Sequence, residues 1–307
     1  MPDYRIYPSL LDKFASLIDY EQEAEQPWNI VSENAHKLGK YLDKEVGDYI
    51  LPPDEMYYKI EGELIDTINR VDGVASEAAD KGTCFNEIVD CLIENRKSSA
   101  PDIEIHSEKL DDNTIAIIAE MDGFRFAYDA QFCKDVAKYF KGAISQHFCK
   151  APIITKYGEV EIYGYIDEWL PNRICDIKTT SYYTFGKFEN KWQRYAYPYC
   201  CIESGETTQV DEFEYTIFVW NKSPLLTATM YKEVYTYRHK QATEKLRAII
   251  EHFIWWLNSR KQYITNQRIF GGANPEGYVG TPINVELLKY RQHGKYNDRQ
   301  DSCNHAN

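Results

Sequence analysis

The sequence lacks several features that would place it in a familiar class of protein. No apolar run is long enough to cross a bilayer, and no basic segment followed by an apolar one stands near residue 1. The eight cysteines include no C-x-x-C pair, so the spacing of a zinc ribbon is absent. No internal repeat is visible. We therefore expect a cytoplasmic protein that does not associate with membranes and whose cysteines are mostly reduced and buried.

An excess of positive charge is also missing. The formal net charge of the 307 residues is -13 at pH 7. This charge argues against a protein that coats nucleic acid non-specifically. It does not exclude an enzyme that holds nucleic acid in one local groove, because a site that gathers carboxylates around a metal is itself acidic.

The length and composition indicate a globular fold with a sizeable core. Hydrophobic residues make up 43% of the chain, which has room for one large domain or two small ones. We expect a helical region over 1–80, a core over 81–262 and a C-terminal extension over 263–307 whose last residues, 293–307, have the composition of a disordered tail. The expected helices of the first region are interrupted at Pro27 and at Pro52–Pro53.

The expected order of elements in the core is a helix, several strands and a final helix. Gly82–Thr83 is expected to open the first core helix, and turn residues separate alternating runs that are typical of strands. This order favours an α/β or α+β fold with a mixed sheet. The expected strands are 103–108, 114–120, 124–128, 145–155, 159–167, 173–180, 212–220 and 225–235, and the expected core helices are 81–97, 131–141, 189–203 and 237–262. Before the core, helices are expected around 10–18, over 32–49 and from Asp54 onward.

One predicted hairpin, over 162–180, carries the chemistry. Pro171–Asn172 supplies the turn. Asp167 lies near the end of the first strand, and Asp176 and Lys178 share one face of the second, because side chains alternate along a strand. Two acids and a lysine in a hydrophobic sheet are costly unless something binds them. A divalent cation and a phosphate are the natural candidates.

The residues of this hairpin suit the hydrolysis of a phosphodiester. Mg²⁺ takes oxygen ligands and keeps several waters, so two or three carboxylates suffice. Asp167 and Asp176 are the expected ligands, joined by the backbone carbonyl of Ile177. Lys178 would position or deprotonate the attacking water, or neutralise the phosphate, and the residues leave these roles open. In this scheme the next two residues, Thr179 and Thr180, offer their hydroxyl and backbone N–H groups to phosphate oxygens.

A D-x-K triplet has little value alone, since average composition yields about one in a chain of this length. The ordered set is more specific: a helix with acids, then Gly164 to Asp167, then Asp176 to Lys178, then a helix with Gln193 and Tyr197. We set aside the E-x-K triplet at 189–191 because it falls at a predicted helix start. The set, over roughly 80–235, resembles the PD-(D/E)XK nuclease superfamily, and more closely its RecB-like and phage-type exonuclease branch with a Q-x-x-x-Y motif.

The resemblance implies a restriction-endonuclease-like core and a Mg²⁺-dependent deoxyribonuclease, an exonuclease rather than an endonuclease, with Mn²⁺ as a substitute metal. It implies that Asp167 and Asp176 bind the metal and that Lys178 is catalytic. Gln193 and Tyr197, four apart on one helix face, would contact the site or the DNA backbone. The implied setting is the cytoplasm of a bacterial or phage-infected cell, with linear double- or single-stranded DNA as the substrate.

The sequence differs from the pattern of RecB-like nucleases at one expected metal ligand. Many RecB-like members carry a histidine on the first core helix, in a G-T-x-x-H pattern, and Asn86 occupies that slot here. Other branches use a glutamate from this helix. We therefore favour Glu87 as the third acidic ligand and Asn86 as a weaker, neutral one, and the number of metals stays open. The four cysteines that an iron–sulfur cluster needs are not suitably spaced, so none is expected.

Two alternatives remain from the sequence. A catalytically inactive, nuclease-fold protein that binds nucleic acid is favoured by Asn86 and by the acidic charge, whereas the intact Asp167, Asp176 and Lys178 argue against it. An ordinary salt-bridged hairpin is the other. If DNA is bound, Lys191 and Arg194 are expected to help form a basic groove. The resemblance also allows a homo-oligomer and a single-strand annealing or recombination partner.

Overall fold

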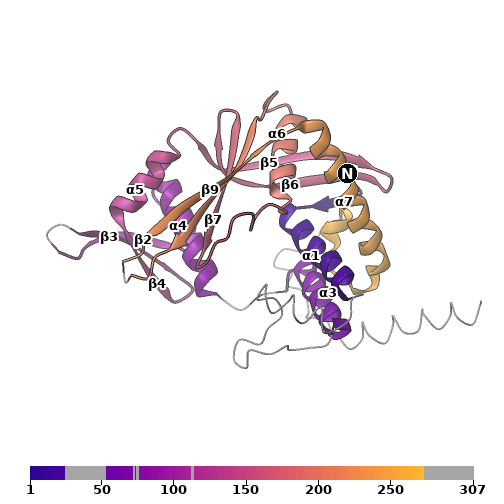
Figure 1. The fold of residues 1–307 in the computed structure, drawn as a ribbon, viewed down its shortest axis with the longest axis horizontal. Coiled ribbons are helices and arrows are strands. Elements are labelled where there is room, and N and C mark those ends of the chain that lie inside the picture. The colour runs from indigo at the N-terminus through magenta and orange to yellow at the C-terminus, as the bar shows by residue number, and fades with distance from the viewer. Residues whose placement is uncertain (25–52, 72, 74–75, 112–113, 224, 273–307) are drawn as a thin grey trace, which may run out of the picture.

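A six-stranded mixed sheet forms the centre of the molecule (Figure 1). The computed structural model describes residues 1–24, 53–71, 73, 76–111, 114–223 and 225–272. The strand order is β1-β6-β7-β8-β9, and β5 pairs with β6. The strands are β1 (Tyr4–Ile6), β5 (Ile144–Thr155), β6 (Gly158–Leu170), β7 (Arg173–Thr180), β8 (Glu212–Trp220) and β9 (Ala228–Thr236).

The sheet is mixed because of how its strands are connected. β6 and β7 are antiparallel and joined by the predicted turn, in which Asn172 has a φ of 63°. β7 and β8 are parallel, and helix α6 (Gln193–Glu203) makes the crossover between them. β1 pairs in parallel with β6, while β5 and β9 are antiparallel to their neighbours.

Helices cover both faces of this sheet. The described helices are α1 (Pro8–Ala24), α3 (Pro53–Asn69), α4 (Glu77–Glu94), α5 (Ala130–Tyr139), α6 and α7 (His239–Ser259), with short turns η1 (Lys261–Tyr263) and η2 (Gln267–Phe270). Apolar residues of α1, α3, α6 and α7 form one core with the sheet. Residues of α4 and α5 form a second core with the other face and with a small antiparallel sheet, β2 (Glu104–Lys109), β3 (Ile115–Met121) and β4 (Phe124–Asp129).

Alternation along β7 explains how one strand serves both cores. Ile174 packs into the core of α6 and α7, whereas Cys175 and Ile177 pack into the core of α4 and α5. Asp176 and Lys178 therefore lie on the α6 face of the sheet. The predicted fold class, a mixed α/β fold with a central mixed sheet flanked by helices, is confirmed.

Several expected boundaries differ from the structure. Helix α4 begins at Glu77, so Gly82–Thr83 lie inside it and do not open it. Residues 189–192 precede α6 and are not helical, so the triplet at 189–191 is not at a helix start. The strand β1 was not predicted, because three residues are too few to show alternation. The expected helix at 32–49 and the tail at 293–307 lie outside the described residues.

None of the helices in the described ranges is long and apolar enough to cross a membrane.

Candidate active site

The candidate site lies where β6 and β7 separate. The two strands pair at Glu168–Cys175, Trp169–Ile174 and Leu170–Arg173, and the ladder then stops. At the next position the Oδ2 atom of Asp167 accepts a hydrogen bond of 2.7 Å from the backbone N–H of Ile177. The Asp167 side chain thus takes the place of a backbone acceptor on β6, which no longer pairs with the N–H of Ile177. The opening of the sheet is therefore built around Asp167.

Asp176, Lys178 and Gln193 form a closed triangle beside this opening. The Nζ atom of Lys178 lies 2.5 Å from Oδ2 of Asp176 and donates to Oε1 of Gln193 at 2.9 Å. The Nε2 atom of Gln193 donates to Oδ1 of Asp176 at 2.7 Å. The side chain of Asp176 is 3% exposed and that of Lys178 is 23% exposed, so the lysine is more accessible to solvent than the acid it pairs with.

The electrostatics of this group are those of crowded acids around one cation. Burial and then the negative charge of Asp176 raise the pKa of Asp167 to about 8. Burial also raises the pKa of Asp176, against the opposing effect of Lys178. Burial by itself would lower the pKa of Lys178, but the two aspartates outweigh it and the pKa is raised. Lys178 is therefore held as an ammonium ion at neutral pH.

A cleft of about 450 Å³ opens between α4 and the separated strands. Asp167, Lys178 and Thr179 line its sheet side, and Asn86 and Asp90 line its helix side. The close approach of the helix depends on a glycine. A Cβ atom on Gly82 would lie 2.5 Å from Oγ1 of Thr179, so no larger residue fits between α4 and β7 without displacement.

Glu87 also lines the cleft, but its carboxylate is already bound. Oε1 of Glu87 accepts from Arg96 at 2.7 Å and from the backbone N–H of Ser99 at 3.0 Å. Burial would raise the pKa of Glu87, and the hydrogen bonds from Arg96 and its neighbours lower it to about 2. The expected set of three acids, Asp167, Asp176 and Glu87, is thus not assembled in this structure.

Asp90 is the acid of α4 that was not predicted. It is 1% exposed, its Oδ1 atom has no hydrogen-bond partner, and burial raises its pKa to about 7. Asp90 interacts with Glu168 of β6, whose own pKa is raised to about 9 by burial and by Asp90. Its position four residues after Asn86, on the same helical face, was a usable signal. The helix therefore presents Asn86 and Asp90 together to the cleft.

Tyr197 has a packing role that explains the glycine of the G-x-x-D motif. A Cβ atom on Gly164 would lie 2.7 Å from Cε1 of Tyr197. Tyr197 is 7% exposed, so its ring fills the space above β6. Gln193 lies one helical turn before it and contacts Asp176. The Q-x-x-x-Y motif thus places Gln193 in the triangle and packs Tyr197 against β6.

The remaining predicted residues are dispersed. The hydroxyl of Thr180 donates to the carbonyl of Tyr182 and accepts from Lys187. Nζ of Lys191 lies 3.8 Å from Oδ2 of Asp12, and Arg194 lines a different pocket from the cleft. Asp12 was not predicted and also accepts from the backbone N–H of Trp192 at 2.7 Å, which fixes the segment that enters α6.

The oxygen atoms around the cleft suit a hard cation. Two buried oxygens without hydrogen-bond partners belong to cleft-lining residues, Oδ1 of Asn86 and Oδ1 of Asp90. A third such oxygen, Oε1 of Glu168, belongs to the residue that follows Asp167. Over the described ranges, no three Asp, Glu, His or Cys side chains are close enough to hold a metal ion. Asp167, Asp176 and the backbone of Ile177 carry oxygen atoms, the ligand type that Mg²⁺ prefers in proteins, and Mg²⁺ retains waters at its other positions.

Comparisons with known proteins found few similarities. No protein-family model matches the chain, and no curated protein matches it. A protein of known structure named SSO0001 is 12% identical over 41% of this chain, with a TM-score of 0.29, and the match spans 55% of that protein's length. A protein from Eubacterium rectale described as a "putative exonuclease" is 13% identical over 76% of this chain and 85% of its own, with a TM-score of 0.36. At these TM-scores neither likeness assigns an activity to this chain.

Proposed function

We propose that this chain is a metal-dependent nuclease of the PD-(D/E)XK type that hydrolyses DNA phosphodiester bonds, and an exonuclease of the phage or recombination type. The observation that supports it is that two side-chain contacts occur together where β6 and β7 separate. Asp167 accepts from the N–H of Ile177, and Asp176 holds Lys178 beside it. The cleft of about 450 Å³ in front of Asp167 and Lys178 gives a substrate access to them.

The proposed reaction is attack of water on phosphorus with cleavage of one P–O bond. Mg²⁺, or Mn²⁺ in its place, would be held by Asp167, Asp176 and the carbonyl of Ile177, and would neutralise charge and make water more acidic. Lys178, as an ammonium ion, would stabilise the negative charge that develops on the phosphoryl oxygens. This assignment favours charge stabilisation over proton abstraction for Lys178, since the nearby aspartates raise its pKa.

Gln193 acts as a positioning residue in this scheme. It donates to Asp176 and accepts from Lys178, so it fixes the positions of the carboxylate and the ammonium group relative to each other. Thr179 lines the cleft and would offer its hydroxyl to a phosphate oxygen. Asn86 and Asp90 are the groups of α4 that would face a bound phosphate or its metal, and Glu87 would join them only after it releases Arg96.

The second candidate function is a nuclease-fold protein that binds nucleic acid without cleaving it. Asn86, in the position where relatives of this type carry a histidine, is the observation that favours it. Metal binding separates the two functions, because a ligand that binds only the folded state raises the melting temperature. The active protein should be stabilised by Mg²⁺ or Mn²⁺, whereas the inactive one should not.

The direct test is degradation of linear double- and single-stranded DNA in Mg²⁺ or Mn²⁺. We expect the wild type to degrade at least one of them and Asp176→Ala and Lys178→Ala to lose at least about a hundredfold in rate. Asp19→Ala and Lys240→Ala change exposed residues away from the cleft and serve as matched controls. A wild type that degrades neither substrate, or site variants as active as the controls, would refute the proposal.

A further inference from the structure

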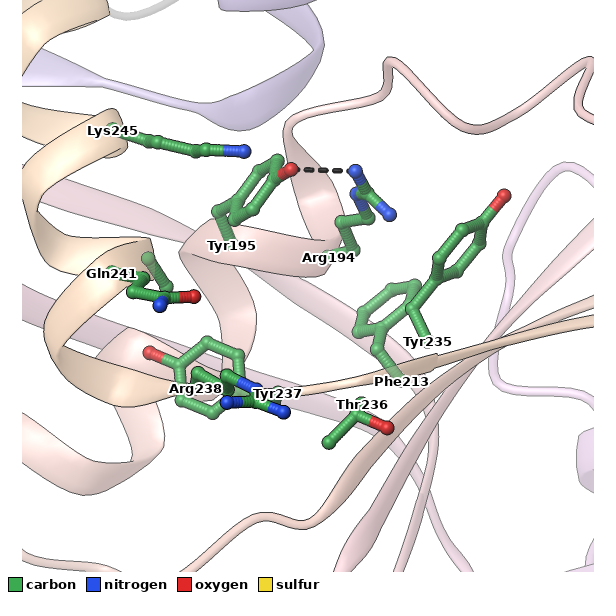
Figure 2. Close-up of a pocket in the computed structure, with 10 residues that line it drawn as sticks. Arg194, Tyr195, Phe213, Tyr235, Thr236, Tyr237, Arg238, Gln241 and Lys245 are labelled. Atoms are coloured by element: carbon green, nitrogen blue, oxygen red, sulfur yellow. Dashed lines mark hydrogen bonds between the residues drawn. The ribbon is translucent and has the colours of Figure 1, made fainter.

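A second pocket, separate from the cleft, lies where the start of α6, the end of β9 and the start of α7 meet (Figure 2). Its volume is about 210 Å³. Arg194 and Tyr195 come from α6, Tyr235 from β9, and Arg238 and Lys245 from the beginning of α7. The other lining residues are Phe213, Thr236, Tyr237, Gln241 and Ala242.

The pocket concentrates positive charge in an acidic protein. Arg194, Arg238 and Lys245 line it, and none of its ten lining residues is Asp or Glu. Within the described ranges, none of these three cations forms an ion pair with a carboxylate. The whole chain has a net charge of -13, so uncompensated cations here are a local departure from its composition. Such a site favours an anion as its ligand.

Aromatic rings hold the cations in place without neutralising them. The guanidinium of Arg194 lies 4.2 Å from the ring centre of Tyr235 and 4.7 Å from that of Tyr195. The ammonium of Lys245 lies 5.5 Å from the ring centre of Tyr195, on which Arg194 and Lys245 converge in Figure 2. Stacking orients these side chains and leaves most of their N–H donors for a ligand.

Further donors lie in residues beside the pocket. The Nε atom of Arg194 is buried and has no hydrogen-bond partner, whereas its NH2 group donates to the hydroxyl of Tyr195 at 2.5 Å. Arg238 is the N-cap of α7 and supplies no capping side chain. The first N–H groups of a helix lack intrahelical partners and carry the positive end of its dipole. The start of α7 therefore adds donors suited to an anion, whereas the buried Nε atom of Arg194 is not accessible to one.

We propose that this pocket binds one phosphoryl group. Arginine forks match the geometry of phosphate oxygens, and three cations suit a group that carries one to two negative charges. The volume is below the range of about 300–1,000 Å³ typical of ligand pockets. The pocket is therefore large enough for a phosphate group but not for a whole nucleotide. The sugar or base of a bound nucleotide would lie outside the pocket, next to its tyrosines.

The position of the pocket allows two sources of that phosphate. Gln193 contacts Asp176, and the next residue, Arg194, lines the pocket. In the sheet, Asp176 pairs with Tyr215, while Phe213, two residues before, pairs with Tyr235. The spacing of strands and residues places the pocket on the order of 10 Å from the triangle. A DNA strand that contacts Lys178, if the proposed function is right, and a free nucleotide are both compatible with this distance.

The test measures binding rather than cleavage, so it does not depend on nuclease activity. Inorganic phosphate, dAMP and a single-stranded oligonucleotide are titrated into the full chain in EDTA, at constant ionic strength. The test variant is the double substitution Arg238→Glu and Lys245→Glu, both exposed residues. The double substitution Lys134→Glu and Lys240→Glu is the matched control, because both residues are exposed, neither lines the pocket, and the change in net charge is the same.

We expect phosphate or dAMP to bind the wild type and the control variant. The pocket variant should bind them at least about tenfold more weakly, as the loss of charged hydrogen bonds predicts. An equal loss of oligonucleotide affinity assigns the phosphate to a DNA strand, and unchanged oligonucleotide affinity assigns it to a free nucleotide. If none of the three probes binds, or if the pocket variant and the control bind all of them alike, the inference is wrong.

Discussion

The Asp167 carboxylate accepts a 2.7 Å hydrogen bond from the backbone N–H of Ile177, at the position where β6 and β7 part. The same aspartate is the expected metal ligand of the first strand. Asp167→Asn keeps an oxygen that can accept from Ile177 and removes the charge. We expect the metal-free melting temperature to stay close to that of the wild type, and stabilisation by Mg²⁺ or Mn²⁺ to disappear.

Asp167→Ala distinguishes the structural role from the electrostatic one. It removes both the charge and the acceptor, so it should also lower the metal-free stability by about 1–3 kcal/mol, because the N–H of Ile177 loses its partner. Melting curves of both variants with and without metal provide the measurement. Retained metal stabilisation in Asp167→Asn would show that Asp167 is not a ligand.

Glu87 and Asp90 are expected to respond differently to loss of charge. Glu87→Gln weakens the ion pair with Arg96 and should cost about 1–2 kcal/mol of stability with little effect on metal affinity. Asp90→Asn removes a buried acid whose pKa is raised to about 7, so it should leave stability unchanged or higher and weaken metal-dependent stabilisation. Calorimetric metal titrations of both variants test this, and the opposite ranking would restore Glu87 as the ligand.

Gly164→Ala tests the packing of the Q-x-x-x-Y tyrosine against β6. The added methyl group would lie 2.7 Å from a ring carbon of Tyr197, and overpacking of this kind costs about 1–3 kcal/mol. We expect a lower free energy of unfolding in urea and a lower rate of DNA degradation, since Tyr197 and Gln193 share α6. Gly73→Ala, with no atom within 4 Å of the new Cβ, is the control. Equal unfolding curves for the two variants would argue against this contact.

Glu61 offers a pH test far from the cleft. It is fully buried, accepts from Arg260 at 2.8 Å and from Trp256 at 3.1 Å, and burial raises its pKa despite Arg260. An acid with a raised folded pKa binds its proton more tightly in the folded state, so its contribution to stability falls as pH rises above the unfolded value of about 4.3. The stability of the wild type relative to Glu61→Gln should therefore decrease from pH 4 towards pH 8 in urea titrations at several pH values. A difference that grows with pH would contradict this assignment.

Much of the fold was predictable because its signals are local. Alternation identified the core strands, Pro171–Asn172 marked the turn, and apolar spacing identified α4, α5 and α7. Helix starts were less predictable, since nothing local distinguishes Glu77 from Gly82 as the beginning of α4. β1 depends on a parallel partner more than 150 residues away, so its three residues carry no sufficient signal.

The local residue pattern was sufficient to predict that Asp176 and Lys178 share a face and that Asp167 lies near them, because a strand has a two-residue period and the turn between the strands is short. Three features depended on the packing of the folded chain. One is the point where β6 and β7 separate. The others are the ion pair of Glu87 with Arg96, which leaves Asp90 facing the acids, and the position of Arg194 in a pocket separate from the cleft. The physical reason is that periodicity is a property of neighbouring residues. Ion pairs, clefts and the close approach of Gly164 to Tyr197 depend on which distant segments pack together.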